Sequence, residues 1–190
     1  MLSVDLLCHP DSTSPAVSRI EVSVSRSAAD VLAVTYRLYG DLDCLRVPAW
    51  HSPASAERLW EHTCFEMFVS RPGASVYHEL NFSPSGAWAA YGFARYREAS
   101  PFAHASLVPQ IAVRRDEGRF ELDASIRLEG LSPDYASAPL VLGLSAVVED
   151  REGGLSYWAL AHPAAKPDFH HRDSFRLVIT AISPSARSPG

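Results

Sequence analysis

Residues 60–93 have the sequence WEHTCFEMFVSRPGASVYHELNFSPSGAWAAYGF. Apolar and polar side chains alternate here in three short segments, which are separated by RPGAS at 71–75 and SPSG at 83–86. Alternation with period two is typical of β-strands with one buried face, and short connectors with Pro and Gly favour tight antiparallel turns. The stretch therefore predicts three consecutive strands of one sheet, at residues 62–70, 76–82 and 87–93.

The same alternation recurs along the rest of the chain. Further strands are predicted at residues 20–24, 31–39, 111–115, 120–126, 140–149, 155–159 and 175–180. About ten strands with little helix predict an all-β fold, a two-sheet antiparallel β-sandwich of the immunoglobulin-like or jelly-roll type. Each sheet has one face in solvent and needs the other sheet to bury its apolar face. One short helix is expected at residues 53–60, where Ser52 can cap it and Pro53 can start it.

Length and composition limit the classes of protein that fit. The chain has 190 residues, 47% of them hydrophobic, which suits one globular domain at residues 1–182 with a flexible tail at 183–190. Its formal net charge is -5, without a long run of Lys or Arg, which argues against a nucleic-acid partner. No apolar run reaches about eighteen residues, so no membrane partner is expected. Residues 1–15 lack the features of a signal peptide, and a cytoplasmic location is expected.

Three cysteines are present, and their number and spacing exclude several site types. Cys8, Cys44 and Cys64 are odd in number, widely spaced and without a C-x-x-C motif. This argues against a disulfide framework, a thiolate zinc site and covalent haem attachment of the c type.

Two acidic residues are the first candidates for a binding site. Alternation places Glu66 on the same face of the predicted hairpin as Glu79 and Asn81. Carboxylates on neighbouring strands repel each other by up to about 1 kcal/mol unless a cation, a shared proton or a ligand lies between them. A binding role accounts for this cost, and Trp88 or Tyr91 on the next strand can supply a ring for stacking on a sugar.

Two alternatives for the acidic pair stay open at this stage. Surface arginines such as Arg95, Arg97 or Arg127 can neutralise the carboxylates on a solvated sheet face. A retaining glycosidase also uses two carboxyl groups about 5 Å apart, a spacing that the hairpin can supply.

The opposite face of the same hairpin contains Met67 and His78, which are ligands that haem iron accepts. Neighbouring cross-strand side chains project in the same direction, whereas two axial ligands approach iron from opposite sides. The pair is therefore not expected to ligate one iron together. The favoured interpretation is that Met67 is a core methionine and His78 a hydrogen-bonded core histidine. Binding of haem b through one of them stays as an alternative.

A second candidate region lies at residues 157–173. Four residues of this segment suit zinc or another divalent transition metal: His162, Asp168, His170 and His171. Pro163 and Pro167 stiffen the segment. A proline-braced loop whose Lys166, Asp168 and His170 border a ligand pocket is preferred over a metal site.

Several of these motifs resemble a known family. They are LWEHTCFEMF at 59–68, YHELNFSPSGAW at 77–88, His162-Pro163 with KPDFHH at 166–171, and LEGL at 128–131. Together they resemble bacterial DOMON-like proteins, which are related to type 9 carbohydrate-binding modules. The resemblance implies a β-sandwich that binds haem or sugar in different branches, and it does not imply catalysis.

We therefore predict a non-catalytic β-sandwich, without a cofactor, that binds a carbohydrate or a sugar-containing metabolite. The expected ligand-binding residues are Trp60, Glu66, Glu79, Asn81, Trp88, Trp158, Lys166, Asp168 and His170. The alternatives are a haem-binding electron-transfer or sensing module, a metal-dependent hydrolase built on the 162–171 loop, and a protein-interaction sandwich. Oligomeric state is left open, because edge strands can be covered by loops or by a partner.

Overall fold

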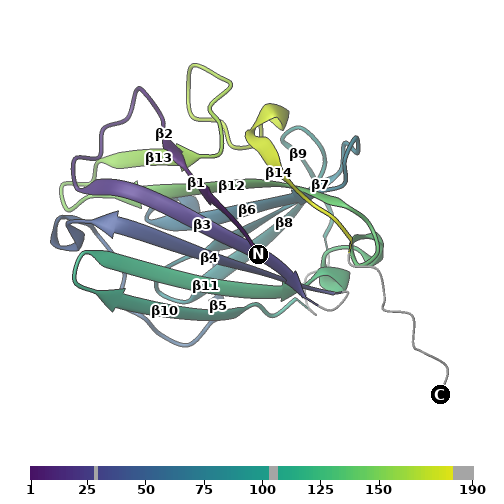
Figure 1. The fold of residues 1–190 in the computed structure, drawn as a ribbon, viewed down its shortest axis with the longest axis horizontal. Coiled ribbons are helices and arrows are strands. Elements are labelled where there is room, and N and C mark those ends of the chain that lie inside the picture. The colour runs from purple at the N-terminus through teal and green to yellow at the C-terminus, as the bar shows by residue number, and fades with distance from the viewer. Residues whose placement is uncertain (28–29, 103–106, 182–190) are drawn as a thin grey trace.

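The computed structural model describes residues 1–27, 30–102 and 107–181, which form two packed β-sheets (Figure 1). The five-stranded sheet has the order β1 (Leu2–Asp5), β3 (Val17–Ser27), β4 (Val31–Gly40), β11 (Arg119–Arg127), β10 (Gln110–Asp116). The nine-stranded sheet has the order β2 (Leu7–Cys8), β13 (Leu155–Ala159), β12 (Leu140–Glu149), β6 (Cys64–Ser70), β7 (Tyr77–Phe82), β8 (Ala87–Arg95), β5 (Ala54–Ser55). In addition, β14 (Phe175–Ile179) pairs with β12, and β9 (Glu98–Ser100) pairs with β8.

Helical structure is restricted, within the described ranges, to single 3-10 turns. These are η1 (Leu42–Cys44), η2 (Leu59–Glu61), η3 (Leu128–Gly130), η4 (Pro133–Tyr135) and η5 (Arg172–Ser174). In the parts of the chain that the structure describes, no helix combines the length and the apolar composition needed to span a membrane.

All ten predicted strands are present, and the prediction of an antiparallel β-sandwich is confirmed. Four short strands, β1, β2, β5 and β9, were not predicted, because two to four residues are too few for alternation to be recognised. Whether residues 1–182 form a single domain stays a prediction, and the proposed tail at 183–190 lies outside the described residues.

The predicted helix at residues 53–60 is wrong. Ala54 and Ser55 instead pair in parallel with β8, and the backbone N–H of Ala56 donates to the Trp88 carbonyl at 2.9 Å. Arg58 then adopts a left-handed conformation with φ 58, which a helix interior excludes. Pairing with the edge of the sheet therefore overrides the local capping signal.

The predicted division of the β6–β7 hairpin into two faces is confirmed. On the face toward the other sheet, Phe65 pairs with Phe82 and Met67 pairs with Leu80. The outward face follows from the same register, since side chains alternate along each strand. It carries the acids Glu66 and Glu79 and the amide Asn81, because Glu66 pairs with Asn81 and Phe68 pairs with Glu79.

Aromatic rings join the two sheets in the core. Tyr36 of β4 is fully buried, packs on Phe65 with ring centroids 5.0 Å apart, and donates its hydroxyl proton to the Glu66 carbonyl at 2.6 Å. Phe65 also stacks on Phe120 of β11, with centroids 5.9 Å apart. Phe65 therefore links β6 to two strands of the opposite sheet.

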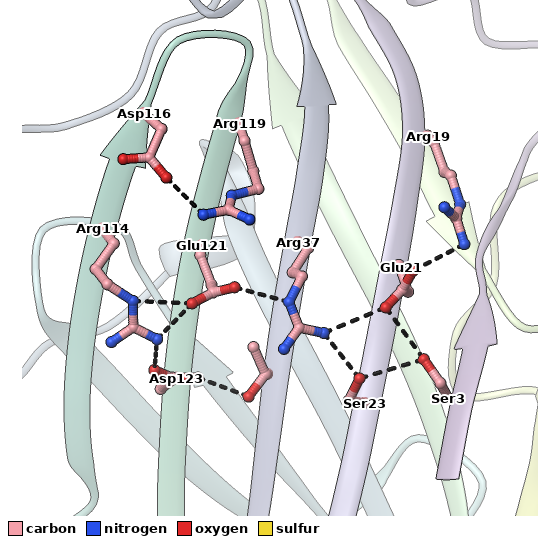
Figure 2. Close-up of polar contacts among 11 residues, drawn as sticks. Ser3, Arg19, Glu21, Ser23, Arg37, Arg114, Asp116, Arg119, Glu121 and Asp123 are labelled. Atoms are coloured by element: carbon pink, nitrogen blue, oxygen red, sulfur yellow. Dashed lines mark hydrogen bonds and ion pairs between the residues drawn. The ribbon is translucent and has the colours of Figure 1, made fainter.

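The outer face of the five-stranded sheet is covered by a charge ladder, in which acids and arginines alternate across the strands (Figure 2). Its members are Arg114, Glu121, Arg37, Glu21, Arg19 and Asp5. Arg37 lies at the centre, with its guanidinium 2.7 Å from Glu121 and 3.2 Å from Glu21. The charges on this face are therefore paired with one another.

We expect Phe65→Ala to lower the free energy of unfolding by about 3–5 kcal/mol, because it leaves a cavity between Tyr36 and Phe120. Urea unfolding followed by tryptophan fluorescence measures the change. Val178→Ala is the matched control, since Val178 is 55% exposed and its truncation is expected to cost less than about 0.5 kcal/mol. Equal losses in the two variants would contradict the assignment of Phe65 to the core.

Glu121→Gln tests the charge ladder. Burial raises the pKa of Glu121, but the hydrogen bonds from Arg114 and Arg37 outweigh it and hold the pKa below its usual range. A carboxyl with a lowered folded pKa stabilises the protein above its unfolded pKa, and this contribution is lost as the pH falls through the folded pKa. The variant should thus be about 1 kcal/mol less stable near neutral pH, and the difference should shrink in acid. Glu117→Gln, on the exposed β10–β11 turn, should match the wild type at both pH values.

Candidate functional site

A cavity of about 410 Å³ lies on the outer face of the nine-stranded sheet. We call it the aromatic cavity, defined by its lining residues Trp60, Glu66, Glu79, Tyr91, Phe93, Arg97, Val147, Tyr157, Pro167, Phe169 and His170. Strands β6, β7, β8, β12 and β13 provide the floor. The walls come from η2, from the β8–β9 turn and from the loop at residues 160–171.

Five aromatic rings surround the cavity. Trp60 is 40% exposed and meets the Tyr91 ring edge-to-face, with centroids 5.8 Å apart. On another side, Tyr157 of β13 lies 6.3 Å from Phe169 of the 160–171 loop. Apolar walls of this kind, with a few polar groups below them, are typical of small-ligand sites.

Two carboxyl groups lie on the cavity floor, and both are nearly inaccessible to solvent. Glu66 is 3% exposed and Glu79 is 5% exposed, and they are diagonal neighbours because Glu66 pairs with Asn81. Burial, and then the charge of Glu79, raise the pKa of Glu66 well above its usual range. Burial raises the pKa of Glu79 to about 7, against opposing effects of Asn81 and Arg97. At neutral pH the pair therefore retains a proton.

Each acid has a specific polar neighbour. The Ser145 hydroxyl donates to Glu66 Oε2 at 3.2 Å, and Asn81 Nδ2 donates to Glu79 Oε1 at 2.8 Å. Asn81 is fully buried, yet its Oδ1 has no hydrogen-bond partner among the residues that the structure describes. Buried acceptors are normally paired, so this oxygen is an unused acceptor beside the two acids.

The orientation of His170 is fixed by a chain of hydrogen bonds. The backbone N–H of Arg97 donates to the Tyr77 hydroxyl at 3.1 Å, and the same hydroxyl is hydrogen-bonded to His170 Nδ1 at 2.8 Å. The other ring nitrogen of His170, Nε2, lies 3.5 Å from Glu79 Oε2. Burial lowers the pKa of His170 to about 4, so the ring that faces Glu79 is neutral at physiological pH.

Asp168 holds the 160–171 loop against the β8–β9 turn. Its Oδ1 accepts from Arg97 Nη2 at 2.8 Å, and its Oδ2 accepts from the Tyr96 hydroxyl at 2.7 Å. Asp168 does not line the aromatic cavity. Its contribution is to neutralise Arg97 and to position the loop that carries His170.

Four of the predicted ligand-binding residues, Trp60, Glu66, Glu79 and His170, line the aromatic cavity together. Asn81 lies beside the acids on the same face. A hairpin, a 3-10 turn and a distant loop therefore contribute residues to the lining of one cavity.

Besides Asp168, three predicted ligand-binding residues lie outside the aromatic cavity, and their expected contacts are corrected here. Trp88 pairs with Phe82, and Trp158 pairs with Ala146, so both indoles face the other sheet and belong to the core. Each is 6% exposed. Lys166 is exposed and lies outside the cavity lining. Alternation alone did not decide which of Tyr157 and Trp158, or of Ala87 and Trp88, faces the ligand side.

The residues of the alternative metal site do not converge. His162 Nε2 is hydrogen-bonded to the Leu7 carbonyl at 2.8 Å, and His171 Nδ1 accepts from the backbone N–H of Asp173 at 3.2 Å. With Asp168 and His170 engaged as above, no group of three or more potential metal ligands occurs within residues 1–27, 30–102 and 107–181. The loop therefore lacks the geometry that the metal hypothesis requires.

Met67 and His78, the residues of the haem alternative, also lie away from the cavity. Met67 is fully buried in the core between the sheets. His78 Nδ1 is hydrogen-bonded to the Tyr135 hydroxyl at 3.0 Å, and burial lowers its pKa to about 4. This placement corresponds to the core methionine and hydrogen-bonded histidine favoured from the sequence.

Comparison with solved structures places this architecture among known proteins. One similar structure is a candidate carbohydrate-binding protein from Bacteroides uniformis ATCC 8492, with a TM-score of 0.66 and 14% identity, covering 92% of this chain and 84% of that one. Another is a family 9 carbohydrate-binding module from Caldicellulosiruptor kristjanssonii in complex with glucose, with a TM-score of 0.59, 8% identity and coverages of 94% and 84%. This chain shares their fold. The same module in complex with cellotriose gives a TM-score of 0.56 at 8% identity, with coverages of 95% and 82%.

No protein-family model matches the sequence, and no curated protein matches it either. The similarity to these structures is therefore one of architecture. Because the sequence identities are low, the binding residues have to be judged from this chain itself.

Most residues that line the aromatic cavity were not predicted from the sequence. Tyr157, Phe169, Phe93 and Arg97 were not among the predicted ligand-binding residues, although they line the cavity. Alternation along β13 places Tyr157 on the face opposite Trp158, but it does not state which of the two faces the ligand side. No comparable signal marks Arg97, which reaches the cavity from a turn where its own φ is 54.

Glu79→Gln tests the burial of an ionisable group on the cavity floor. A carboxyl whose pKa is raised on folding stabilises the protein below its unfolded pKa, and this stability is lost as the pH rises through the folded pKa of about 7. Relative to the wild type, the variant should therefore gain on the order of 2 kcal/mol between about pH 4.5 and about pH 7.5. Urea unfolding at the two pH values measures this gain, with Glu117→Gln as the exposed control. A pH-independent difference would show that Glu79 titrates normally.

Proposed function

We propose that this protein binds a carbohydrate in the aromatic cavity, without chemical turnover. The observation that carries the proposal is the arrangement of two buried carboxyl groups and a buried amide beneath five aromatic rings. Sugar rings present C–H faces that stack on aromatic rings, and hydroxyl groups that bond to carboxyl and amide oxygens. Both kinds of partner face the same cavity.

Each part of the cavity has a place in this proposal. Trp60 stacks on the sugar at the exposed mouth, and Tyr157 with Phe169 contacts it from the other side. Glu66 and Glu79 accept hydroxyl protons, and the proton that the pair retains allows one of them to donate. A volume of about 410 Å³ is in the range of pockets that bind small molecules.

The fold supports this choice of ligand class. The family 9 modules that share it were solved with glucose and with cellotriose. The motifs that resemble DOMON-like proteins, YHELNF above all, place Glu79 and Asn81 on the cavity side of β7. A binding role without catalysis is consistent with all of these features.

Trp60→Ala tests the site. Calorimetric titration with glucose and cellotriose should show binding to the wild type, and the variant should bind about tenfold more weakly because a stacking surface at the mouth is lost. Trp50→Ala is the matched control, since Trp50 is 45% exposed and lies outside the cavity lining. Equal affinities in the wild type and Trp60→Ala would contradict the proposed site, and absence of sugar binding to the wild type would contradict the function.

A further inference from the structure

The acids of the aromatic cavity lack a cationic partner. Among the described residues, no Arg or Lys forms an ion pair with Glu66 or Glu79, and His170, 3.5 Å from Glu79, is neutral at physiological pH. Arg97 is near, and its charge lowers the pKa of Glu79, but its guanidinium is paired with Asp168 at 2.8 Å. Because Glu66 and Glu79 lack such a partner in the described part of the chain, the negative charge of the cavity is uncompensated whenever both acids are ionised. This is unusual, since buried carboxylates are normally paired with a cation.

The other groups that face the acids do not supply positive charge. They are Cys64 on β6, Tyr77 on β7, Tyr91 on β8, Ser145 on β12 and Tyr157 on β13. Burial raises the pKa of the Cys64 thiol and of the Tyr91 hydroxyl, and the carboxylates add to both effects. The Cys64 thiol and the Tyr91 hydroxyl therefore stay neutral beside the acids.

The aromatic rings add a second feature that favours positive charge. The faces of aromatic rings attract cations, and cages of several rings recognise ammonium groups. Trp60, Tyr91, Tyr157 and Phe169 line the space above the acids. A ligand with only hydroxyl groups satisfies the carboxyl oxygens but makes no use of this electrostatic feature.

We propose that the ligand of the aromatic cavity carries a positive charge, as an amino sugar with a free ammonium group directed at Glu66 and Glu79. This inference rests on the proposed function and names its ligand class. The ammonium group forms charge-assisted hydrogen bonds with the two acids, while the sugar ring contacts the aromatic walls. Binding displaces a proton from the acid pair to solvent, because the cation favours the ionised carboxylates.

Three matched ligands test the inference by calorimetric titration: glucosamine, its neutral counterpart N-acetylglucosamine, and glucose. Glucosamine should bind at least tenfold more tightly than either neutral sugar near neutral pH. Glu79 has a pKa of about 7, so it is mostly protonated at about pH 5.5 and far more often ionised at about pH 7. Glucosamine should therefore bind about tenfold more tightly at about pH 7 than at about pH 5.5, although the ammonium group of the sugar is protonated at the lower pH. The neutral sugars should lack this dependence.

Proton release gives a readout independent of affinity. In two buffers of different ionisation enthalpy, the apparent binding enthalpy of glucosamine should differ in proportion to the protons released, and that of N-acetylglucosamine should not. Glu79→Gln should abolish the preference for glucosamine and the proton release. Glu117→Gln, exposed on the opposite sheet, should retain both.

The outcomes separate this inference from the proposed function. If all three sugars bind with similar affinity and without proton release, the inference is overturned and carbohydrate binding stands. If choline, a permanent cation without a sugar ring, binds while none of the sugars does, both the amino-sugar ligand and the carbohydrate function are overturned. Failure of all four probes to bind overturns both.

Discussion

Packing between the two sheets at Phe65 is the contact on which the rest of this structure depends. The Phe65 ring lies against Tyr36 and Phe120 of the opposite sheet, and the Tyr36 hydroxyl bonds to the backbone carbonyl of Glu66. Because side chains alternate along β6, fixing Phe65 inward fixes Glu66 outward. The core and the candidate site are thus two faces of one strand, and a register slip of one residue would exchange them.

A covering loop turns the outward sheet face into a cavity. Pro167, Phe169 and His170 of the loop at residues 160–171 line the cavity above the outer face of β6, β7 and β8. Asp168 holds this loop through Arg97 and Tyr96, and His170 docks on Tyr77 and faces Glu79. Burial of the acids, and hence their raised pKa values, follows from these tertiary contacts.

The acidic residues on the two outer faces of the sandwich differ in whether their charges are paired. On the five-stranded sheet, Glu121 is held between Arg37 and Arg114, so its pKa is lowered and its charge is neutralised within the charge ladder. On the nine-stranded sheet, Glu66 has no such partner among the described residues and its pKa is raised. Paired charges solubilise and stabilise a sheet face, whereas an uncompensated buried acid is typical of a functional site.

The sequence by itself determined the fold class, the ten main strands, and the faces of the β6–β7 hairpin, because period-two alternation is a local property of the chain. The residue types also singled out Trp60, Glu66, Glu79 and His170, which the structure places in the lining of the aromatic cavity. Only the tertiary structure decided that Trp88 and Trp158 face the core while Tyr157 and Phe169 enclose the cavity. The physical reason is that alternation states which residues share a face of one strand, but the packing of sheets and loops decides which face is covered, and by what.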